Sequence, residues 1–258
     1  MLLAGSTWKE VESYLRESRG VVVPMGSTEQ HGPIGLVGTD AYTAEAVARG
    51  LGERVGALVA PTLSLGVAQF NLGFPGTISV RASTLMATIE DLVLSLAAQG
   101  FERFYFINGH GGNVAPARAA FQDIYARWSL GERSGTAPRC RLRSWWEYPG
   151  ADSLRRELYG AGEGMHATPS EIAITRHAQP EAFGRVEGRL PAPPVLSAAY
   201  LRDHGGDNHW DARSHRAAFP DGRVGSDSAL ATREQGTALL EASIAGAIED
   251  YRAFLVEP

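Results

Sequence analysis

The sequence predicts an α/β fold in which a mainly parallel sheet carries helices on both faces. Short apolar runs alternate with stretches of helical spacing over roughly the first 145 residues, a pattern typical of parallel sheets with crossover helices. Two polar, glycine-rich segments, 26–40 and 108–113, also follow apolar runs directly. Parallel sheets bind ligands at the carboxyl ends of their strands, so these segments are the first candidates for a functional site.

Each expected strand is a short run rich in Val, Phe, Tyr or Leu. The four strands are placed at 21–24, 57–61, 104–107 and 139–145. Apolar residues at helical spacing predict helices at 41–54, 84–99 and 115–128. Thr7 and Glu10 form a capping-box pattern before a short helix that ends near residue 18. Ser83 is expected to cap the 84–99 helix.

The second half of the chain is less regular. Helices are expected at 152–159 and 169–178, whereas 184–227 is rich in Pro, Gly, Asp and His and is expected to form long loops over one rim. A capping box of Thr232 and Gln235 opens a helix over 233–254. Because the sequence contains no repeat and no low-complexity linker, one domain over 1–258 is the simplest interpretation.

The composition excludes several classes of protein. The 258 residues carry a net charge of -5 with no basic block, which argues against nucleic-acid binding. A single cysteine excludes an internal disulfide framework and a Cys-rich zinc site. No stretch reaches the roughly 18 apolar residues that span a bilayer. The first apolar run is too short for a signal peptide, so we expect a cytoplasmic protein without membrane partners.

The segment after the first strand offers a candidate metal site. If 29–31 is extended, Glu29 and His31 point to the same side, and Asp40 can return to the same place after a loop. Two carboxylates and an imidazole suit a divalent metal. The alternative is that Asp40 caps the 41–54 helix and that Glu29 and His31 are simply solvated.

The second polar segment places His110 between glycines, after a strand and before a helix. Glycines allow tight backbone conformations and close approach, and amides at a helix start favour an anion or a developing oxyanion. The alternative is a turn with a hydrogen-bonded histidine. The spacing is not that of a dinucleotide-binding fingerprint.

Together these motifs resemble the creatininase (creatinine amidohydrolase) family. The matching pieces are PMGSTEQHG (24–32) with GTD (38–40), NLGFPGTIS (71–79), INGHGGN (107–113), His166 with Glu171, and the segment GRVGSDSALATREQG near the C-terminus. They occur in the order and spacing of the family and cover nearly the whole chain.

The resemblance implies a three-layer α/β/α sandwich with two divalent metal ions at the strand ends. It implies that Glu29, His31, Asp40 and His110 are metal ligands, with Asp40 in the bridging position, and that His166 is a proton donor. Members with creatininase activity carry a Glu where this chain has Gly112. Members with NGHGGN use a later Glu, which matches Glu171.

Some features complicate this assignment. Thr168 and Glu171 also form a capping box with Pro169 at the first helical position, so Glu171 is a ligand or a helix cap. The chain has Ile34 where the family commonly has His, and Ile172-Ala173 where the family has Thr-Ser. Gly112 argues against creatinine as the substrate.

We therefore hypothesise a metal-dependent hydrolase of carbon–nitrogen bonds in cyclic or linear amides. Two metals would share a water and lower its pKa, the amides of Gly111 and Gly112 would help to stabilise the oxyanion, and His166 would protonate the leaving nitrogen. Zinc, manganese and iron all suit such ligands. One alternative is cleavage of a carbon–carbon bond in a cyclic diketone, and another is a non-catalytic metal-binding homologue.

The remaining expectations concern partners and specificity. A small-molecule substrate is expected, with specificity determined by the 62–77 and 184–227 loops. His204, His209 and His215 lie in a loop that could cover the site. The resemblance implies a homo-oligomer and suggests a hexamer.

Overall fold

The computed structural model describes residues 1–183, 190–205 and 209–258. At its centre is a four-stranded sheet in the order β2-β1-β3-β4, and every neighbouring pair is parallel. The strands are β1 (Gly20–Met25), β2 (Leu58–Val59), β3 (Arg103–Asn108) and β4 (Arg139–Ser144). The predicted α/β fold with a parallel sheet is confirmed, although β2 is shorter than the predicted 57–61.

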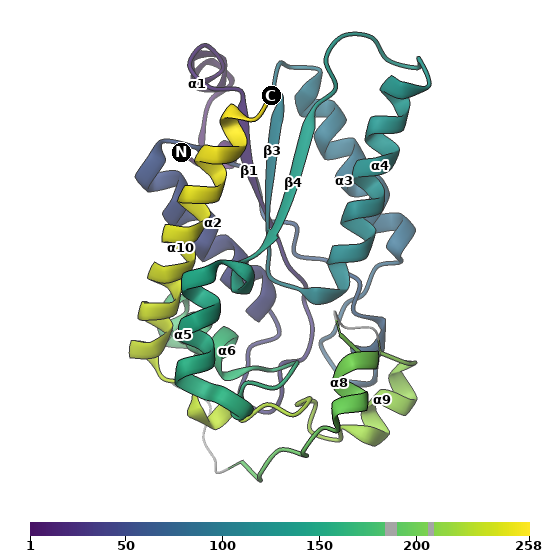
Figure 1. Ribbon diagram of the computed structural model, residues 1–258, viewed down its shortest axis with the longest axis vertical. Coiled ribbons are helices and arrows are strands. Elements are labelled where there is room, and N and C mark those ends of the chain that lie inside the picture. Colours follow the sequence, from purple (N-terminus) through teal and green to yellow (C-terminus); the bar gives the residue numbers. More distant parts are fainter. Residues whose placement is uncertain (184–189, 206–208) are drawn as a thin grey trace.

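Helices cover both faces of this sheet and give the three expected layers (Figure 1). One face carries α2 (Thr39–Val55), α5 (Pro149–Tyr159), α6 (Pro169–Ala178) and α10 (Arg233–Val256). The other face carries α3 (Ala82–Ala97) and α4 (Val114–Ser129). The shorter helices are α1 (Trp8–Tyr14), α7 (Pro180–Phe183), α8 (Ala198–Asp203) and α9 (Ala212–Ala218).

The alternation of side chains along the strands builds a separate core on each face. Val22 of β1 and Tyr105 of β3 belong to the core beneath α2 and α10. Val23 and Phe106, one residue further along each strand, belong to the core beneath α3 and α4. Because successive side chains of a strand point to opposite faces, a strand buried on both sides is apolar throughout, as the sequence of β1 is.

The structure confirms some of the predicted helix caps and contradicts others. The capping boxes at Thr7 and Thr232 are confirmed. The prediction for Ser83 is wrong, because α3 begins at Ala82 and Arg81 occupies the N-cap position. Asp40 is not an N-cap either: Gly38 takes that position in α2, and Asp40 lies in the first turn, where a carboxylate is favoured by the helix dipole.

The expected loop over 184–227 is partly helical. Helices α8 and α9 lie within it, each with a polar N-cap side chain, Ser197 for α8 and Asp211 for α9. The parts of this loop at 184–189 and 206–208 lie outside the described residues. Among the described helices, none combines the length and apolarity required to cross a membrane.

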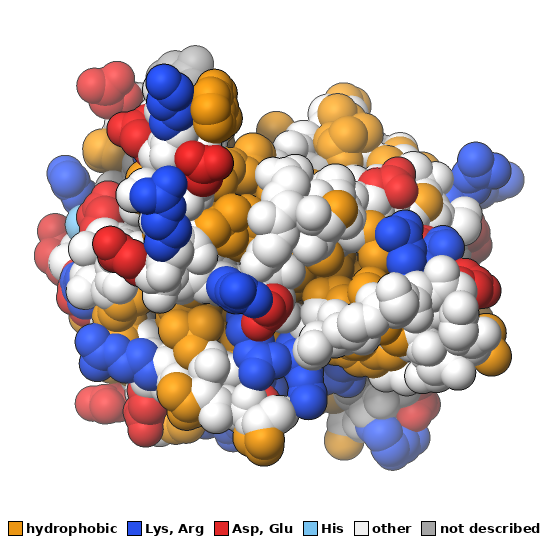
Figure 2. All heavy atoms as spheres, turned by 90° about the horizontal axis from the view of Figure 1, so that it is seen from above, with side chains coloured by type: hydrophobic (Ala, Val, Ile, Leu, Met, Phe, Trp, Pro, Cys, Tyr) orange, Lys and Arg blue, Asp and Glu red, His pale blue; other side chains and the backbone are white. Residues whose placement is uncertain are grey.

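The two chain termini lie near the same end of the molecule (Figure 1), and this end is viewed in Figure 2. Lys and Arg side chains are interspersed there with Asp and Glu and with hydrophobic side chains (Figure 2). The strands run away from this end, so their carboxyl ends point toward the end of the molecule that carries α8 and α9 (Figure 1).

The first turn of α2 packs directly against the ends of β1 and β3 through two glycines. A Cβ atom on Gly26 would lie 2.4 Å from the backbone nitrogen of Ala41, and one on Gly109 would lie 2.1 Å from the carbonyl oxygen of Asp40. Neither distance is compatible with a side chain. The absence of a Cβ at both positions therefore allows Asp40 to reach the strand ends.

We predict that Gly109→Ala lowers the free energy of unfolding by about 1–3 kcal/mol or more, because the methyl group forces α2 away from the sheet. Gly150→Ala is the matched control, since its added Cβ would approach nothing closer than 3.9 Å, the Cβ of Ala242. Urea unfolding of both variants measures the difference. Equal stability of the two would show that this contact does not constrain the fold.

Candidate metal centre

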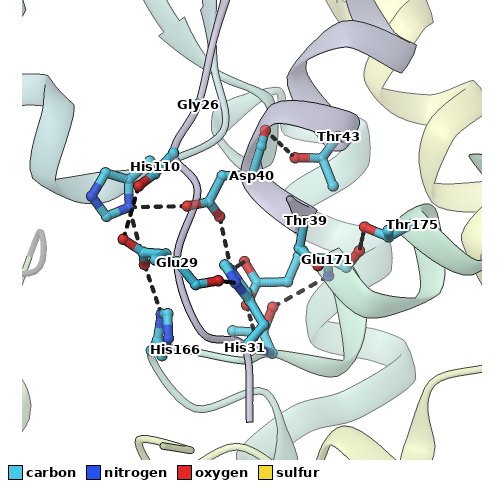
Figure 3. Close-up of polar contacts among 12 residues, drawn as sticks. Gly26, Glu29, His31, Thr39, Asp40, Thr43, His110, His166, Glu171 and Thr175 are labelled. Atoms are coloured by element: carbon cyan, nitrogen blue, oxygen red, sulfur yellow. Dashed lines mark hydrogen bonds and ion pairs between the residues drawn. The ribbon is translucent and has the colours of Figure 1, made fainter. Parts of the chain in front are cut away.

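Six buried polar side chains converge at the carboxyl ends of β1 and β3 (Figure 3). They come from the loop after β1, the first turn of α2, the loop after β3, the segment just before α6, and the first turn of α6. They are Glu29, His31, Asp40, His110, His166 and Glu171. The structure thus brings together all the residues that the sequence analysis named as metal ligands or as the proton donor.

Two triads within this cluster share Asp40. Glu29, Asp40 and His110 offer ligand atoms that all lie within 4.8 Å of one another, and so do His31, Asp40 and Glu171. The two carboxylate oxygens of Asp40 are divided between them, since Oδ2 lies 3.2 Å from His110 Nδ1 and Oδ1 lies 2.9 Å from His31 Nε2. This arrangement suits two cations bridged by one carboxylate. The ligand atoms of Glu29, His31 and His166 also lie within 4.8 Å of one another.

Each of the three histidines is oriented by a backbone carbonyl. A carbonyl oxygen only accepts hydrogen bonds, so the ring nitrogen that faces it must donate. His31 Nδ1 donates to the carbonyl of Glu29 at 3.0 Å, and His110 Nε2 donates to that of Val67 at 2.9 Å. His166 Nε2 lies 2.8 Å from the carbonyl of Gln30 and also faces the side-chain amide nitrogens of Gln30 and Asn71. In each ring the other nitrogen points into the cluster. This is the outer-shell pattern that fixes histidine tautomers at metal sites.

The charges of the cluster also favour the binding of cations. Burial disfavours the charged form of His31, but Asp40, Glu171 and Glu29 outweigh it and raise the pKa of His31 to about 10. Burial raises the pKa of the Glu171 carboxyl to about 7, against the opposing effect of His31. Three carboxylates buried together are costly unless they are paired. The mixed nitrogen and oxygen donors fit divalent ions such as zinc or manganese.

Glu171 caps α6 and also has the geometry for the ligand role that its sequence context left as the alternative. Its Oε1 accepts a hydrogen bond from the backbone N–H of Thr168 at 2.5 Å and completes the capping box of α6. Its Oε2 faces the cluster, 3.8 Å from His31 Nε2. One carboxylate therefore caps the helix with one oxygen and presents the other to the candidate centre.

Sequence reasoning missed two buried amide side chains that hold the cluster in place. The Asn71 Nδ2 donates to Glu29 Oε1 at 3.1 Å, and Asn71 Oδ1 accepts from Gln30 Nε2 at 2.8 Å. Both amide nitrogens also lie within 3.3 Å of His166 Nε2. Gln30 stands inside the first motif and Asn71 inside NLGFPGTIS, so their place in the matched motifs was the available signal.

In the part of the chain that the structure describes, Phe70 joins the group of His204, His209 and His215 to the cluster. They pack as a group of aromatic rings, with centroids of His204 and His209 5.5 Å apart and those of His209 and His215 4.8 Å apart. Phe70 lies between this group and the centre, because its ring contacts His209 at 4.6 Å and His166 at 6.2 Å. Within the described residues, none of the three lines the cavity at the cluster.

A cavity of about 220 Å³ opens onto the cluster. It contains Asp40, His110, His166 and Glu171 in its wall, so a molecule in it meets both triads. The remainder of the lining consists of Gly109, Gly111, Trp145, Trp146, Arg155, Glu163, Gly164, Met165, Thr168 and Ser170.

The family model described as "Creatininase: Creatinine amidohydrolase" matches residues 4–250. The chain belongs to the creatininase family. The fold agrees with solved members: a mutant creatininase in a Zn–Zn form superposes with a TM-score of 0.80 at 25% identity, covering 99% of this chain and 98% of the other.

Two curated relatives are similar over shorter segments. A mycofactocin precursor peptide peptidase of Mycobacterium ulcerans is 32% identical over 190 residues, which is 70% of this chain and 66% of that protein. A creatinine amidohydrolase of Pseudomonas putida is 38% identical over 113 residues, 42% of this chain and 44% of that protein. The matched segments thus cover less than two thirds of either relative.

The position of Gly112 cannot carry a glutamate in this creatininase-family chain. A Cβ there would lie 2.4 Å from the carbonyl oxygen of Val67 and 2.7 Å from His110 Nε2. Any side chain would therefore displace the hydrogen bond that orients His110. The third carboxylate of the cluster comes instead from Glu171 on α6.

The other departures from the family pattern are core residues. Ile34, Ile172 and Ala173 are buried in the apolar cluster beneath α2 and α10. None of them lines the cavity in the part of the chain that the structure describes. These substitutions therefore add apolar packing behind the centre and remove no polar group from the cavity wall.

We predict that Glu171→Gln separates the two roles of this side chain. The amide oxygen can still accept from Thr168, so the metal-free variant should unfold within about 1 kcal/mol of the metal-free wild type. Loss of the charge should weaken divalent-metal binding by roughly 10-fold or more. Glu171→Ala should lose both the helix-cap hydrogen bond and the metal affinity. Calorimetric titration with Zn²⁺ and thermal unfolding measure the two effects, and unchanged metal affinity in Glu171→Gln would exclude the ligand role.

We also predict that Asn71→Ala weakens zinc binding by about 10–100-fold, because Glu29 loses the donor that orients it. Gln69→Ala is the matched control, since that amide is close in sequence but donates to the carbonyls of His209 and Trp210. Titrating both variants with Co²⁺ and following its visible spectrum reports ligand geometry directly. Identical spectra and affinities would contradict a positioning role for Asn71.

Proposed function

We propose that this chain is a metal-dependent amidohydrolase that hydrolyses a carbon–nitrogen bond of a small amide or peptide. The observation that carries the proposal is the pair of buried triads that share Asp40 beside a cavity wide enough for a small substrate. The named relatives, a peptidase and a creatinine amidohydrolase, both act on such bonds by their names. These two names favour the carbon–nitrogen assignment over the diketone alternative.

In this proposal Glu29, Asp40 and His110 hold one divalent ion, and His31, Asp40 and Glu171 hold the second. Ions bound there would lower the pKa of a water molecule and polarise the substrate carbonyl. Zinc or manganese fits these donors best. The protein supplies fixed orientation, because Val67, Glu29 and Gln30 carbonyls and the Asn71 amide hold the ligand side chains before any ion arrives.

His166 is the residue we assign to proton transfer. Burial, followed by the charge of His31, lowers the pKa of His166 well below its ordinary value, so the ring is neutral near pH 7. Its Nε2–H is engaged by the carbonyl of Gln30, and Nδ1, 3.6 Å from Glu29 Oε1, is the atom that accepts and returns a proton. The Gly111 backbone at the cavity wall is proposed to face the developing oxyanion.

We further propose a homo-oligomer, a hexamer by family resemblance, with a cytoplasmic location suggested by the composition. Light scattering tests the proposed homo-oligomer by measuring the mass of the assembly. A monomer in dilute solution would contradict it.

The test of the hydrolase proposal compares wild type with Asp40→Asn, using protein stripped with chelator and reloaded with Zn²⁺ or Mn²⁺. We expect about two ions per chain in the wild type and a loss of at least one in the variant, with turnover at least about 100-fold lower. Glu241→Gln is the control, since that carboxylate pairs with Arg54 outside both the cluster and the cavity lining. Substrates are creatinine, short peptides, anilides and a cyclic diketone.

Hydrolysis of the diketone alone would replace the carbon–nitrogen assignment with carbon–carbon cleavage. Bound metal without turnover of any compound would favour a non-catalytic homologue. Retention of both ions in Asp40→Asn would remove the bridging role of Asp40.

A further inference from the structure

Two charged side chains in the cavity wall take no part in the proposed metal centre. Arg155 comes from α5, and Glu163 follows the 3₁₀ turn Gly160–Gly162. Both line the same cavity as Asp40, His166 and Glu171. Arg155 is the only Arg or Lys among the residues described as lining it. A substrate held at the metal centre therefore lies within the same cavity as this pair.

The pair is held firmly in place. Arg155 Nη1 donates to Glu163 Oε1 at 3.2 Å, and Arg155 Nη2 donates to Asp152 Oδ1 at 2.7 Å. Ser170 Oγ, in the first turn of α6, donates to the same Oε1 of Glu163 at 2.5 Å. Glu163 is 7% exposed. These contacts pre-organise the two groups, which reduces the entropy that a ligand loses on binding to them.

Each member of the pair nevertheless keeps one polar atom without a hydrogen-bond partner. These atoms are Arg155 Nε, a donor, and Glu163 Oε2, an acceptor, and both are buried. Buried polar groups are nearly always satisfied, and leaving one unpaired costs stability. An ion pair that served only to join α5 to α6 would be more stable with these atoms paired. One donor and one acceptor, on two side chains that are hydrogen-bonded to each other, match the C=O and N–H of an amide.

We propose that Arg155 and Glu163 form a substrate subsite that binds a second amide group, distant from the bond that is cleaved. Arg155 Nε–H donates to the amide oxygen, and Glu163 Oε2 accepts from the amide N–H. The exposed fifth of the Arg155 side chain (20%) is the part that an entering ligand meets first. This inference rests on the proposed function, since it extends the substrate to molecules with at least two amides.

The test uses two anilides of equal chain length. N-acetylglycine anilide carries the second amide, and pentananilide replaces it with methylenes. For zinc-loaded wild type we expect roughly tenfold tighter binding of N-acetylglycine anilide by calorimetry, the difference that one or two hydrogen bonds to charged groups supply. Where a probe is hydrolysed, kcat/KM should show the same preference.

Glu163→Gln and Arg155→Lys should each reduce this preference to about unity while binding of pentananilide is unchanged. Arg156→Lys is the matched control, because Arg156 pairs with Asp152 on the same helix but lies outside the cavity lining, and it should keep the preference. Thermal unfolding of each variant checks that it is folded.

Three results would overturn the subsite: no preference in the wild type, a preference that survives in both variants, or equal weakening of both probes, which indicates a structural role only. A preference observed without any hydrolysis would leave the subsite in place and reject the hydrolase. Hydrolysis of both anilides at equal rates and with equal affinity would support the hydrolase and reject the subsite.

Discussion

The centre depends on the close approach of the first turn of α2 to the ends of β1 and β3. Gly26 and Gly109 make this approach possible, because a single methyl group at either position would collide with the backbone around Asp40. The helix start brings a carboxylate into the gap between two strand ends, and those strand ends deliver Glu29 and His110. The two triads share Asp40 because this one turn lies between them.

The parts of the fold that could be predicted from sequence are those with a strong local period. The strands around Val22 and Tyr105 and the helix opened by Thr232 follow from apolar patterning and capping chemistry. Glu29, His31 and Asp40 were expected to meet after the first strand, and the family resemblance added His110, which follows another strand of the same sheet. The Asn71 contacts to Glu29 and Gln30 could not be predicted, because they join segments about 40 residues apart and leave no periodic signal.

Other differences between the prediction and the structure also depend on contacts that leave no signal in the local sequence. Ser83 was predicted to cap α3, but the helix begins one residue before it, at Ala82. Helices α8 and α9 are short and lie in a segment dominated by Pro, Gly and Asp. Helix α9 packs against the Gln69–Gly73 turn, a tertiary contact that overrides local propensity. The sequence could not show that one oxygen of Glu171 caps α6 while the other faces the cluster, because both positions depend on the fold around the carboxylate.

The origin of Glu171 on α6 ties the two triads to different parts of the fold. Four of the converging side chains come from the first 110 residues, whereas His166 and Glu171 come from a segment whose helix packs against α2 and α10. The triad of Glu29, Asp40 and His110 therefore depends on the strand ends and the first turn of α2. The triad that contains Glu171 depends in addition on the packing of α6 against α10, a helix that contributes no ligand atom to either triad. A change in the contact between α6 and α10 thus bears on one half of the centre and leaves the other in place.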